Sequence, residues 1–533
     1  MKSRLELYQP FLQIALLLLA VIALYAGSLS APLVFDDPAN TEKFSHTYFS
    51  LDPRWLPYAT FSWTINWLGF DIFWLRLSNV LLHAANAITL FFLLRRLFQV
   101  TLANNDASDG IPPSLVWFAF FGALIFALHP VAVYGVAYLI QRSTLMATLF
   151  VLLMLRVYLE GLLRGGWYWM LAAVLFYFAA IFSKEHSIAA PGVALALTFL
   201  IRKPSAALLK QIAPYSILLV LIAAIVIYFY SAKGILGAAY EPRAMGMLNL
   251  SARMQGLTDL PNIYVLSILT QSWLFFKYLF LWLVPNPAWM SVDMREPFAM
   301  SLFGWYTLGL IAFLAYFFSA VWLLLKQGRM GLLGFALLFP WILFLTEFST
   351  VRIQEPFVLY RSYLWTPGLF AALPVVFGWL SPKKAFLLLG AVSLLLIPLT
   401  LNRLNTFSSA LLLWDDAEKL VRSKPNVFGT ERIYFNRGTE LGQLRRYNEA
   451  IADFSKAITA NPFDFMYGNR GTAYYFLGMY QEALRDYDRA IALNPDNPDS
   501  YNGRALTYRA LGNLVAAQED FKKSCELGLC LQH

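Results

Sequence analysis

Two adjacent carboxylates follow the first apolar segment of this sequence. Asp36 and Asp37 stand in the run Val34-Phe35-Asp36-Asp37-Pro38. An ionisable group beside lipid is costly and by default marks a functional site. Such a pair can act as a general base, hold a divalent metal ion, or cap the N-terminus of a short helix. The residue types alone leave these three roles open.

Basic residues stand in three later segments of the same kind. Arg142 follows His129-Pro130-Val131 inside an apolar stretch, so it needs an anionic partner, either a carboxylate of the protein or a phosphate of a lipid carrier. Lys184 and Glu185 lie between two apolar segments, where they either neutralise each other or face a ligand. Arg361 enters a further apolar segment and is expensive there without a partner. We expect these segments to meet on one side of a membrane.

The composition requires a membrane to position these groups. The 533 residues are 59% hydrophobic and 14% charged, which excludes a soluble globular protein and a disordered one. The apolar run Phe11 to Ala26 is long enough to cross a bilayer, and we interpret it as an uncleaved first span. Ten further spans are predicted, at 72–94, 115–133, 136–155, 167–183, 187–201, 212–230, 299–325, 330–347, 363–380 and 385–402.

Basic residues set the predicted orientation. The run 263–284 carries polar side chains at helical spacing, and we interpret it as an interfacial helix on the outer surface. With eleven spans and a cytoplasmic N-terminus, the cytoplasmic segments hold thirteen basic residues against four acidic ones. The C-terminal region then lies outside the cytoplasm.

The net charge of +9 does not indicate a nucleic-acid partner. Residues 403–533 contain 16 basic and 16 acidic residues, so the whole excess lies in residues 1–402. The cytoplasmic segments account for it. The charge therefore reports orientation.

The C-terminal region repeats itself with a period of 33 to 34 residues. Asn436-Arg437-Gly438 recurs as Asn469-Arg470-Gly471, and each copy is followed by an Ala-Ala-Pro pattern, with a third copy around Arg504-Ala505. This looks like the tetratricopeptide repeat, an array of helical hairpins that presents a concave surface to a peptide or protein. A degenerate helix is expected ahead of the array, between Trp414 and Pro425.

The only cysteines are Cys525 and Cys530. Two cysteines cannot build a disulfide framework or a four-thiolate zinc site. In an oxidising compartment they either pair or stay as free thiols.

In this order, the segments resemble the transmembrane and tetratricopeptide-repeat containing family. These are protein O-mannosyltransferase-like membrane enzymes, within the polyprenyl-phosphate-sugar glycosyltransferases of GT-C fold. The resemblance covers nearly the whole chain. It rests on Phe35-Asp36-Asp37, Asn79 to His83 with Asn86, His129-Pro130-Val131 with Arg142, Ser183-Lys184-Glu185, Gln271 to Asp293, Arg361 to Gly368 and the terminal repeats.

The resemblance implies an all-α protein in two domains, a GT-C-like transmembrane domain at 1–402 and an extracytoplasmic repeat domain at 403–533. It implies an inverting enzyme that moves a mannose-like hexose from a polyprenyl-phosphate carrier to a Ser/Thr hydroxyl of an acceptor protein. The short loops and brief array favour a bacterial inner membrane, with the repeats in the periplasm.

The resemblance also suggests roles for individual residues. Asp36 is expected to be the base, with Asp37 orienting the acceptor or sharing a divalent metal ion. Arg142, Lys184 and Arg361 are expected to bind the donor phosphate. The repeat groove is expected to capture the acceptor. Supporting roles are expected for Arg54, His129, Glu185, Gln271 and Tyr363.

Two alternatives belong to other classes. A non-catalytic scaffold for envelope or pilus assembly explains the repeats but gives no reason for the buried arginines. A GT-C enzyme acting on a lipid or polysaccharide acceptor keeps the chemistry and changes the substrate. A transporter is disfavoured because the two halves show no inverted repetition.

Overall fold

The computed structural model describes residues 4–46, 54–103, 111–203, 205–238, 262–353, 355–424 and 427–530, with side chains from residue 10 and none at 45 and 46. The chain is α-helical and carries no strand among these residues. It divides into two compact units, Met1–Val292 with Phe298–Ser408, and Asp293–Pro297 with Ser409–His533.

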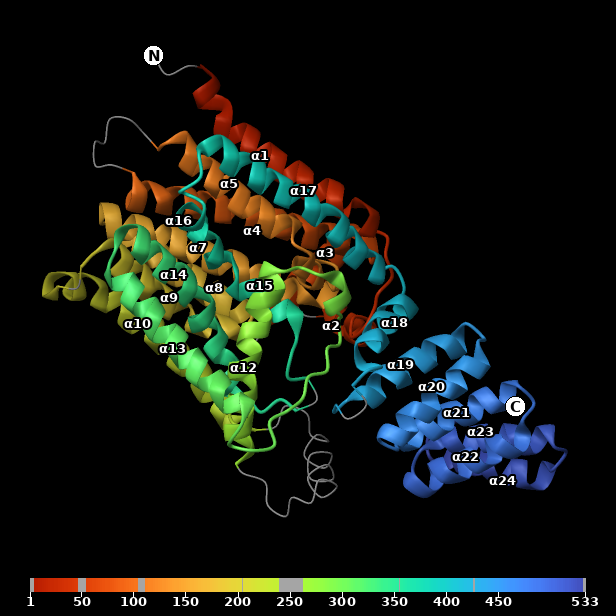
Figure 1. Ribbon diagram of the computed structural model, residues 1–533. Helices are drawn as coiled ribbons and strands as arrows, with labels where there is room; N and C mark the ends of the chain where they lie inside the picture. The colour runs from red at the N-terminus through yellow and green to blue at the C-terminus, as the bar shows by residue number, and fades with distance from the viewer. Residues whose placement is uncertain are drawn as a thin grey trace. The chain divides into compact units, whose positions relative to one another are not determined.

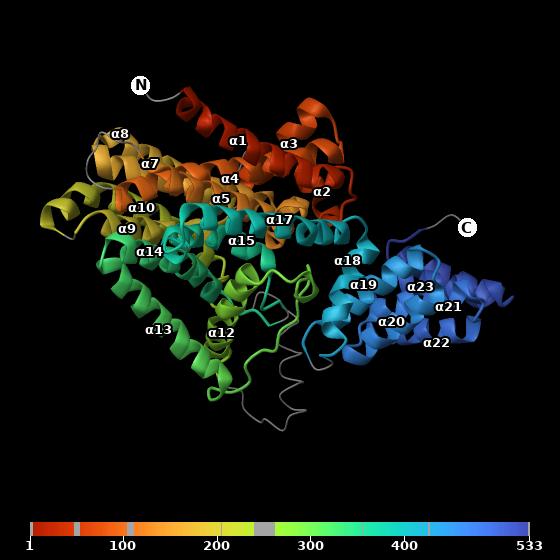
Figure 2. The same ribbon diagram turned by 45° about the horizontal axis from the view of Figure 1, so that its top comes forward.

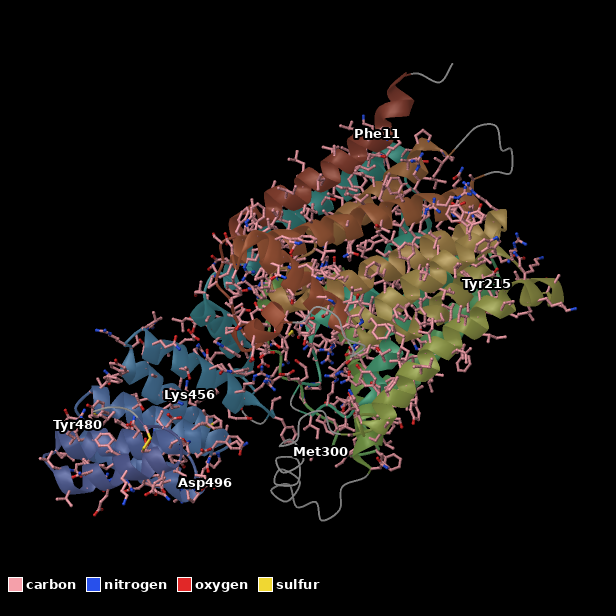
Figure 3. The ribbon with its side chains drawn as sticks, turned by 180° about the vertical axis from the view of Figure 1, so that it is seen from behind. Phe11, Tyr215, Met300, Lys456, Tyr480 and Asp496 are labelled. Carbon is pink, nitrogen blue, oxygen red and sulfur yellow. A yellow bond between two sulfur atoms is a disulfide. The ribbon has the colours of Figure 1, made fainter. Side chains whose placement is uncertain are left out.

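Long apolar helices build the first unit. They are α1 (Arg4–Tyr25), α4 (Ile72–Leu102), α5 (Pro113–Leu128), α7 (Arg142–Arg164), α8 (Trp167–Ser183), α9 (Ala190–Ile201), α10 (Ala206–Ala232), α12 (Ile263–Leu283), α13 (Trp305–Leu325), α14 (Gly328–Phe344) and α17 (Pro382–Thr406). Figures 1 and 2 show α5 and α17 side by side, with α4 next to α5 and α12, α13 and α14 grouped together. Many side chains on the outer surfaces are large and apolar, such as Phe11, labelled in Figure 3, which is 69% exposed. Helices with apolar outer faces suit a lipid environment.

Eight helices in the described part of the chain are long and apolar enough to cross a membrane, or nine if one bent pair counts as a span. That pair is Pro113–Leu128 and Pro130–Val136, bent by 51° where Pro130 interrupts the helix. The sequence predicted eleven spans. Predicted spans 167–183 and 187–201 form helices shorter than this criterion requires, and α12, predicted to be interfacial, satisfies it.

The predicted span at 363–380 is not one helix. It consists of α15 (Ser362–Trp365), η9 (Pro367–Ala372) and α16 (Leu373–Val376). Pro367 is the first residue of η9 and Pro374 the second residue of α16, and neither has a backbone N–H to continue a preceding helix. Gly368 lies directly against the ring of Phe339, so the broken segment packs tightly onto α14.

The second unit is a stack of helices in antiparallel pairs. Its helices are α18 (Ala410–Val421), α19 (Thr430–Gln443), α20 (Tyr447–Ala460), α21 (Asp464–Phe476), α22 (Tyr480–Leu493), α23 (Pro498–Ala510) and α24 (Leu514–Glu526). Helices α19 to α24 form three hairpins with the predicted repeat period, and α18 packs against α19 as the predicted preceding helix. The tetratricopeptide prediction therefore agrees with the structure. Cys525 and Cys530 form a disulfide, drawn in yellow in Figure 3.

In each repeat, an arginine of the first helix pairs with an aspartate of the second helix. Arg470 on α21 holds Asp486 on α22 through two hydrogen bonds of 2.7 and 2.8 Å, and its third nitrogen donates to Ser455 of the preceding hairpin at 2.9 Å. Arg437 binds Asp453 in the same way, and Arg504 binds Asp520. The spacing of 16 residues is identical in all three repeats. These bidentate pairs fix both the hairpin and the stacking of its neighbour.

Replacing Arg470 by Ala is expected to loosen the second hairpin, because Asp486 would be left buried without its charged partner. The cost is about 1–3 kcal/mol. Hydrogen exchange of the full-length protein in detergent, followed by mass spectrometry, should show faster exchange in α21 and α22. Arg489→Ala, an exposed residue of α22, is the matched control. Equally faster exchange in both variants would contradict this role of the Arg470–Asp486 pair.

Candidate functional site

Four segments of the first unit meet around the predicted carboxylates: the turn 34–37, the segment 138–144, the segment 184–186, and the chain from Glu347 to Arg361. Hydrogen bonds and ring contacts link them, as described below. These segments, which are distant in the sequence, therefore lie together in the structure, as the sequence predicted.

The turn 34–37 places Asp36 at the surface and Asp37 in the interior. Phe35 has a φ of 60°, a left-handed conformation that is unusual for a bulky residue, and the Asp37 N–H donates to the carbonyl of Val34 at 3.1 Å. As a result Asp36 is exposed and Asp37 is fully buried. The two neighbours cannot share one role.

Asp37 is a structural cap for a distant segment. Its carboxylate accepts the backbone N–H of Ile140 at 2.9 Å and that of Leu139 at 3.3 Å. These residues lie in and beside η4 (Leu139–Gln141), which leads into α7. Of the three roles that the sequence left open, the cap describes Asp37, although the capped segment is a hundred residues away. Burial raises the pKa of its carboxyl from the ordinary 3.8 to about 7, against the opposing effects of those N–H groups and of Arg76.

Asp36 keeps its carboxylate at the surface. Its Oδ2 accepts the hydroxyl of Tyr138 at 2.8 Å, and the Tyr138 ring lies edge-on to Phe35, with centroids 5.4 Å apart. Asn40 donates to the Asp36 carbonyl at 2.7 Å and steadies the turn from the other side. This is the geometry of a held but reachable carboxylate.

Two tyrosines connect Asp36 with Lys184. The ring of Tyr138 lies edge-on to that of Tyr360, with centroids 5.8 Å apart, and the Lys184 ammonium lies 5.0 Å from the Tyr360 ring centroid. Lys184 donates to Thr144 Oγ1 at 2.7 Å and to Gln141 Oε1 at 3.0 Å. Both partners are neutral. Burial holds the pKa of Lys184 well below its ordinary value, so an anion brought close to it would favour its protonated form.

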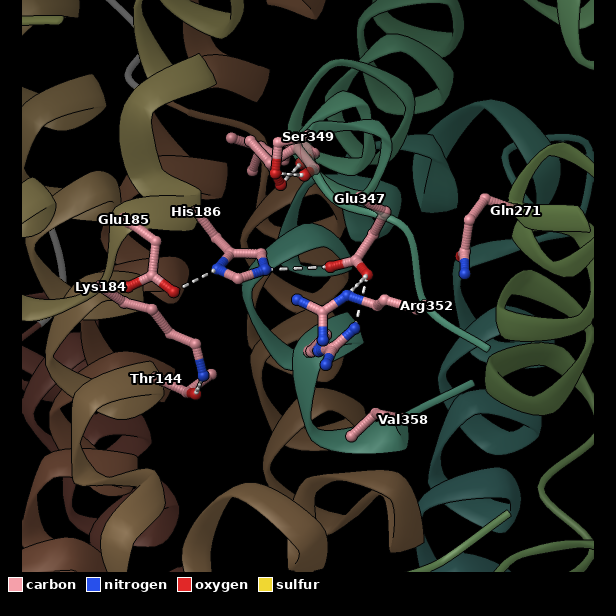
Figure 4. A network of polar contacts seen from close by, with 12 residues as sticks. Thr144, Lys184, Glu185, His186, Gln271, Glu347, Ser349, Arg352 and Val358 are labelled. Carbon is pink, nitrogen blue, oxygen red and sulfur yellow. Dashed lines mark hydrogen bonds and ion pairs between the residues drawn. The ribbon is translucent and has the colours of Figure 1, made fainter. Parts of the chain in front are cut away.

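An alternating chain of acids and bases begins at Glu185, next to Lys184 in the sequence, and runs through His186 to Glu347 and Arg352, as Figure 4 shows. Arg54 binds Glu185 through Nε at 2.7 Å, and His186 Nδ1 lies 3.3 Å from the same carboxylate. The other ring nitrogen of His186 lies 3.0 Å from Glu347. Glu347 also accepts from Arg361 at 2.6 Å, with Arg352 at 3.6 Å.

Glu347 and His186 were not among the predicted site residues. Glu347 is fully buried and meets three basic side chains, and His186 joins it to Glu185. The available signal was Glu347 itself, the single carboxylate in the apolar run 330–347. Arg361 has the protein carboxylate that its position required, and Glu185 pairs with Arg54 more closely than with its neighbour Lys184.

Arg142 lies inside the helix bundle without a carboxylate partner among the contacts described. It donates to Asn79 Oδ1 at 2.9 Å, to the Leu75 carbonyl at 2.8 Å and to the Ser78 hydroxyl, and its guanidinium lies 3.6 Å from the centroid of the Phe61 ring. It is 1% exposed. The sequence argument that it needs an anion is therefore corrected: neutral oxygens and a ring satisfy it, and we omit it from the site.

Three further predicted residues serve the interior. His129 caps η3 (Pro130–Ala132) by accepting the Val131 N–H at 3.2 Å, and its ring stacks on Trp282. Tyr363 pairs through its hydroxyl with His83 at 2.6 Å. Gln271 donates to the carbonyl of Pro356 at 2.7 Å, which places it behind the Arg352 to Arg361 segment. These contacts are structural.

No cluster of three or more His, Cys, Asp or Glu side chains with metal-binding geometry occurs in the part of the chain that the structure describes. Asp37 is committed to backbone N–H groups, and Asp36 points to Tyr138. The two carboxylates of the turn are therefore not arranged as a shared ligand pair. A metal ion stays an untested prediction.

Known proteins resemble this chain in its C-terminal part. Residues 431–464 match the family described as tetratricopeptide repeat, and residues 471–527 match the one described as TPR repeat. No curated protein matches the sequence.

Among solved structures, the first TPR of Spaghetti (RPAP3) bound to the HSP90 peptide SRMEEVD is 28% identical over 18% of this chain and 79% of its own, with a TM-score of 0.18. MamA MSR-1 is 23% identical over 25% of this chain and 75% of its own, with a TM-score of 0.21.

The burial of Asp37 predicts a pH dependence of stability. The folded protein keeps this proton up to about pH 7, whereas the unfolded chain releases it near 3.8, so the contribution of Asp37 falls as pH rises between these values and is constant above them. The difference in melting temperature between the wild type and Asp37→Asn should change across that window. Thermal unfolding in detergent at a series of pH values measures it, and parallel curves would refute the assignment.

Proposed function

We propose that this protein is an inverting membrane glycosyltransferase of GT-C type, which moves a hexose from a polyprenyl-phosphate carrier to a Ser/Thr hydroxyl of an acceptor protein at the outer face. The observation that carries the proposal is the exposed Asp36 carboxylate, linked by Tyr138 and Tyr360 to the buried cation Lys184. The motifs that resemble the glycosyltransferase family occur in these same segments.

The reaction needs a base and a cationic group at opposite ends of one bond exchange. Asp36 takes the proton of the acceptor hydroxyl as its oxygen bonds to the anomeric carbon from the face opposite the leaving group. The bond from that carbon to the carrier phosphate breaks, and its electron pair leaves with the polyprenyl phosphate. The positive charge of Lys184 then stabilises the developing phosphate charge.

The ion pairs of Glu185 and Glu347 stabilise this arrangement. Arg361 already serves Glu347, and Arg54 already serves Glu185. In the proposed reaction they supply positive potential and hold the Tyr360 and Lys184 segments in place. Arg361 follows Tyr360 in the sequence, and Glu185, which Arg54 binds, follows Lys184. A donor phosphate would bring a further anionic acceptor close to these guanidinium groups.

The repeats are proposed to bind the acceptor. A repeat array joined to the enzyme raises the local concentration of its substrate without adding contacts at the reacting centre. We place the chain in a bacterial inner membrane with the repeats in the periplasm, where an oxidising environment permits the Cys525–Cys530 disulfide. No nucleic acid is involved.

A membrane-anchored, non-catalytic scaffold is the second candidate, favoured by the tetratricopeptide repeats at 431–464 and 471–527. It requires no access to Asp36. An enzyme with a lipid or polysaccharide acceptor differs only in the second substrate. The variants below separate the scaffold from the enzyme, and the choice of acceptor in the same assay separates the two enzymes.

Asp36→Asn is expected to lower sugar transfer by a factor of roughly 10² to 10⁴, because the amide cannot take the proton. Purified protein, a lipid-linked sugar and candidate acceptors, followed by mass spectrometry, provide the measurement. Asp71→Asn is the matched control, since Asp71 caps α4 through the Phe73 N–H at 2.8 Å and Asn caps equally well. Undiminished transfer by Asp36→Asn would overturn the base, and no transfer by the wild type with any donor would favour the scaffold.

Arg361→Ala is expected to weaken use of the donor more than use of the acceptor. Glu347 keeps His186 and Arg352 as partners in this variant, so the segment retains part of its support. Steady-state kinetics should show a higher KM for the lipid-linked sugar with a smaller change for the acceptor. Equal changes for both substrates would assign Arg361 to structure alone.

A further inference from the structure

An apolar groove lies between the N-terminal ends of α5 and α17, with a volume of about 280 Å³. Its walls include Trp117, Phe121, Phe386 and Leu389, and Ser114 contributes one hydroxyl. This groove belongs entirely to the first unit and shares no lining residue with the Asp36 site. A binding site for a small apolar group is commonly such a concave, preformed surface.

Aromatic contacts hold the groove in shape. The ring of Phe386 meets Trp117 edge-on with centroids 5.0 Å apart, and it meets Phe121 in the same way at 5.2 Å. Edge-to-face pairs of this kind are favourable arrangements. Phe386 nevertheless remains 41% exposed, so the rings form an open wall that other apolar matter can cover.

The groove lies at one end of the packed pair α5 and α17. At their other ends, Thr400 of α17 donates to the carbonyl of Leu128 at the end of α5, next to His129. The 16 residues of α5 span about 24 Å at 1.5 Å per residue. Because α17 qualifies as a membrane span and starts at Pro382, the groove lies near the end of a span, at the depth of lipid headgroups.

The groove has positive charge at one end, and the nearest acidic residues in the sequence, Asp106 and Asp109, precede α5 and lie outside the described residues. Lys383 and Lys384 are exposed and directly adjoin the lining residues Pro382 and Ala385. The segments 111–128 and 356–402, which supply all the lining, contain no Asp or Glu. An apolar trough next to two solvent-facing ammonium groups is complementary to a ligand with a hydrocarbon part and an anionic head.

We infer that this groove binds an anionic glycerophospholipid, with part of one acyl chain against the aromatic wall and the phosphate beside Lys383 and Lys384. A neutral phospholipid matches the wall and not the lysines. A free phosphate matches the lysines and not the wall. The volume suits a portion of one chain and is too small to enclose a whole lipid. The inference rests on the membrane location in the proposed function and is independent of glycosyl transfer.

Native mass spectrometry of the full-length protein tests the inference, using dioleoyl phosphatidylglycerol, dioleoyl phosphatidylcholine and short-chain dihexanoyl phosphatidylglycerol as probes. The long-chain anionic lipid should bind most tightly. The double variant K383A/K384A should weaken its binding by about 25-fold, since each basic residue near an anionic lipid contributes roughly a factor of five. K203A/K210A removes two exposed lysines from another part of the predicted cytoplasmic surface and should leave binding unchanged.

The variant Ser114→Phe places a ring in the groove and should weaken both dioleoyl lipids while sparing the lysines. Equal binding of the dihexanoyl and dioleoyl anionic lipids would overturn the role of the wall. Equal binding of the two dioleoyl lipids, or equal losses in K383A/K384A and K203A/K210A, would overturn the role of the lysines. Displacement of phosphatidylglycerol by equimolar undecaprenyl phosphate would assign the groove to the carrier lipid and overturn the choice of occupant. Unchanged sugar transfer by K383A/K384A would leave the proposed function intact.

Discussion

Glu347 imposes the constraint on which the membrane unit depends. A fully buried carboxylate is tolerated only when cations and hydrogen bonds compensate for the lost water. Arg361, Arg352 and His186 compensate Glu347, and His186 extends the chain of charges to Glu185 and Arg54. The start of α3 (Trp55–Leu68), the link between α8 and α9, and the segment after α14 are thereby held to one arrangement. Removing a member would weaken the compensation of a neighbouring buried charge, which is why these distant segments stay together.

The same cost of burial distinguishes Asp36 from Asp37. One left-handed residue, Phe35, sends Asp37 inward, where backbone N–H groups of the Leu139 segment occupy its oxygens. Asp36 faces outward and accepts the hydroxyl of Tyr138. Asp37 therefore positions Tyr138 by fixing the next residue in the chain, and Tyr138 positions Asp36. The position of the exposed Asp36 carboxylate therefore depends on the buried Asp37 carboxylate of the same turn.

The sequence predicted the helical class, the repeat hairpins with the helix before them, and the meeting of Asp36, Lys184 and Arg361 segments, because apolar runs, a fixed repeat period and costly charges are properties of local sequence. It did not predict partners across the fold. The sequence predicted that Arg142 needs an anionic partner. In the structure, neutral oxygens of Asn79, Leu75 and Ser78, which lie far away along the chain, accept its hydrogen bonds instead. The segment 363–380 reads as a span by hydropathy, yet its prolines and its packing against Phe339 divide it. Such outcomes depend on tertiary contacts, which hydropathy averages away.

The distribution of charge separates structural from ligand-facing groups. In the repeats, Arg437, Arg470 and Arg504 each form a bidentate pair with an aspartate, so each has a carboxylate of the protein as its partner. In the ion-pair chain, each acid likewise meets a base. Lys184 differs, because it donates hydrogen bonds to the neutral oxygens of Gln141 and Thr144. Lys383 and Lys384 differ because they are exposed on a helix without acidic residues. A cation without a protein carboxylate gains most from an external anion. We therefore propose the tyrosine-lined Lys184 position and the mouth of the α5–α17 groove as the two places where this unit meets an anionic ligand.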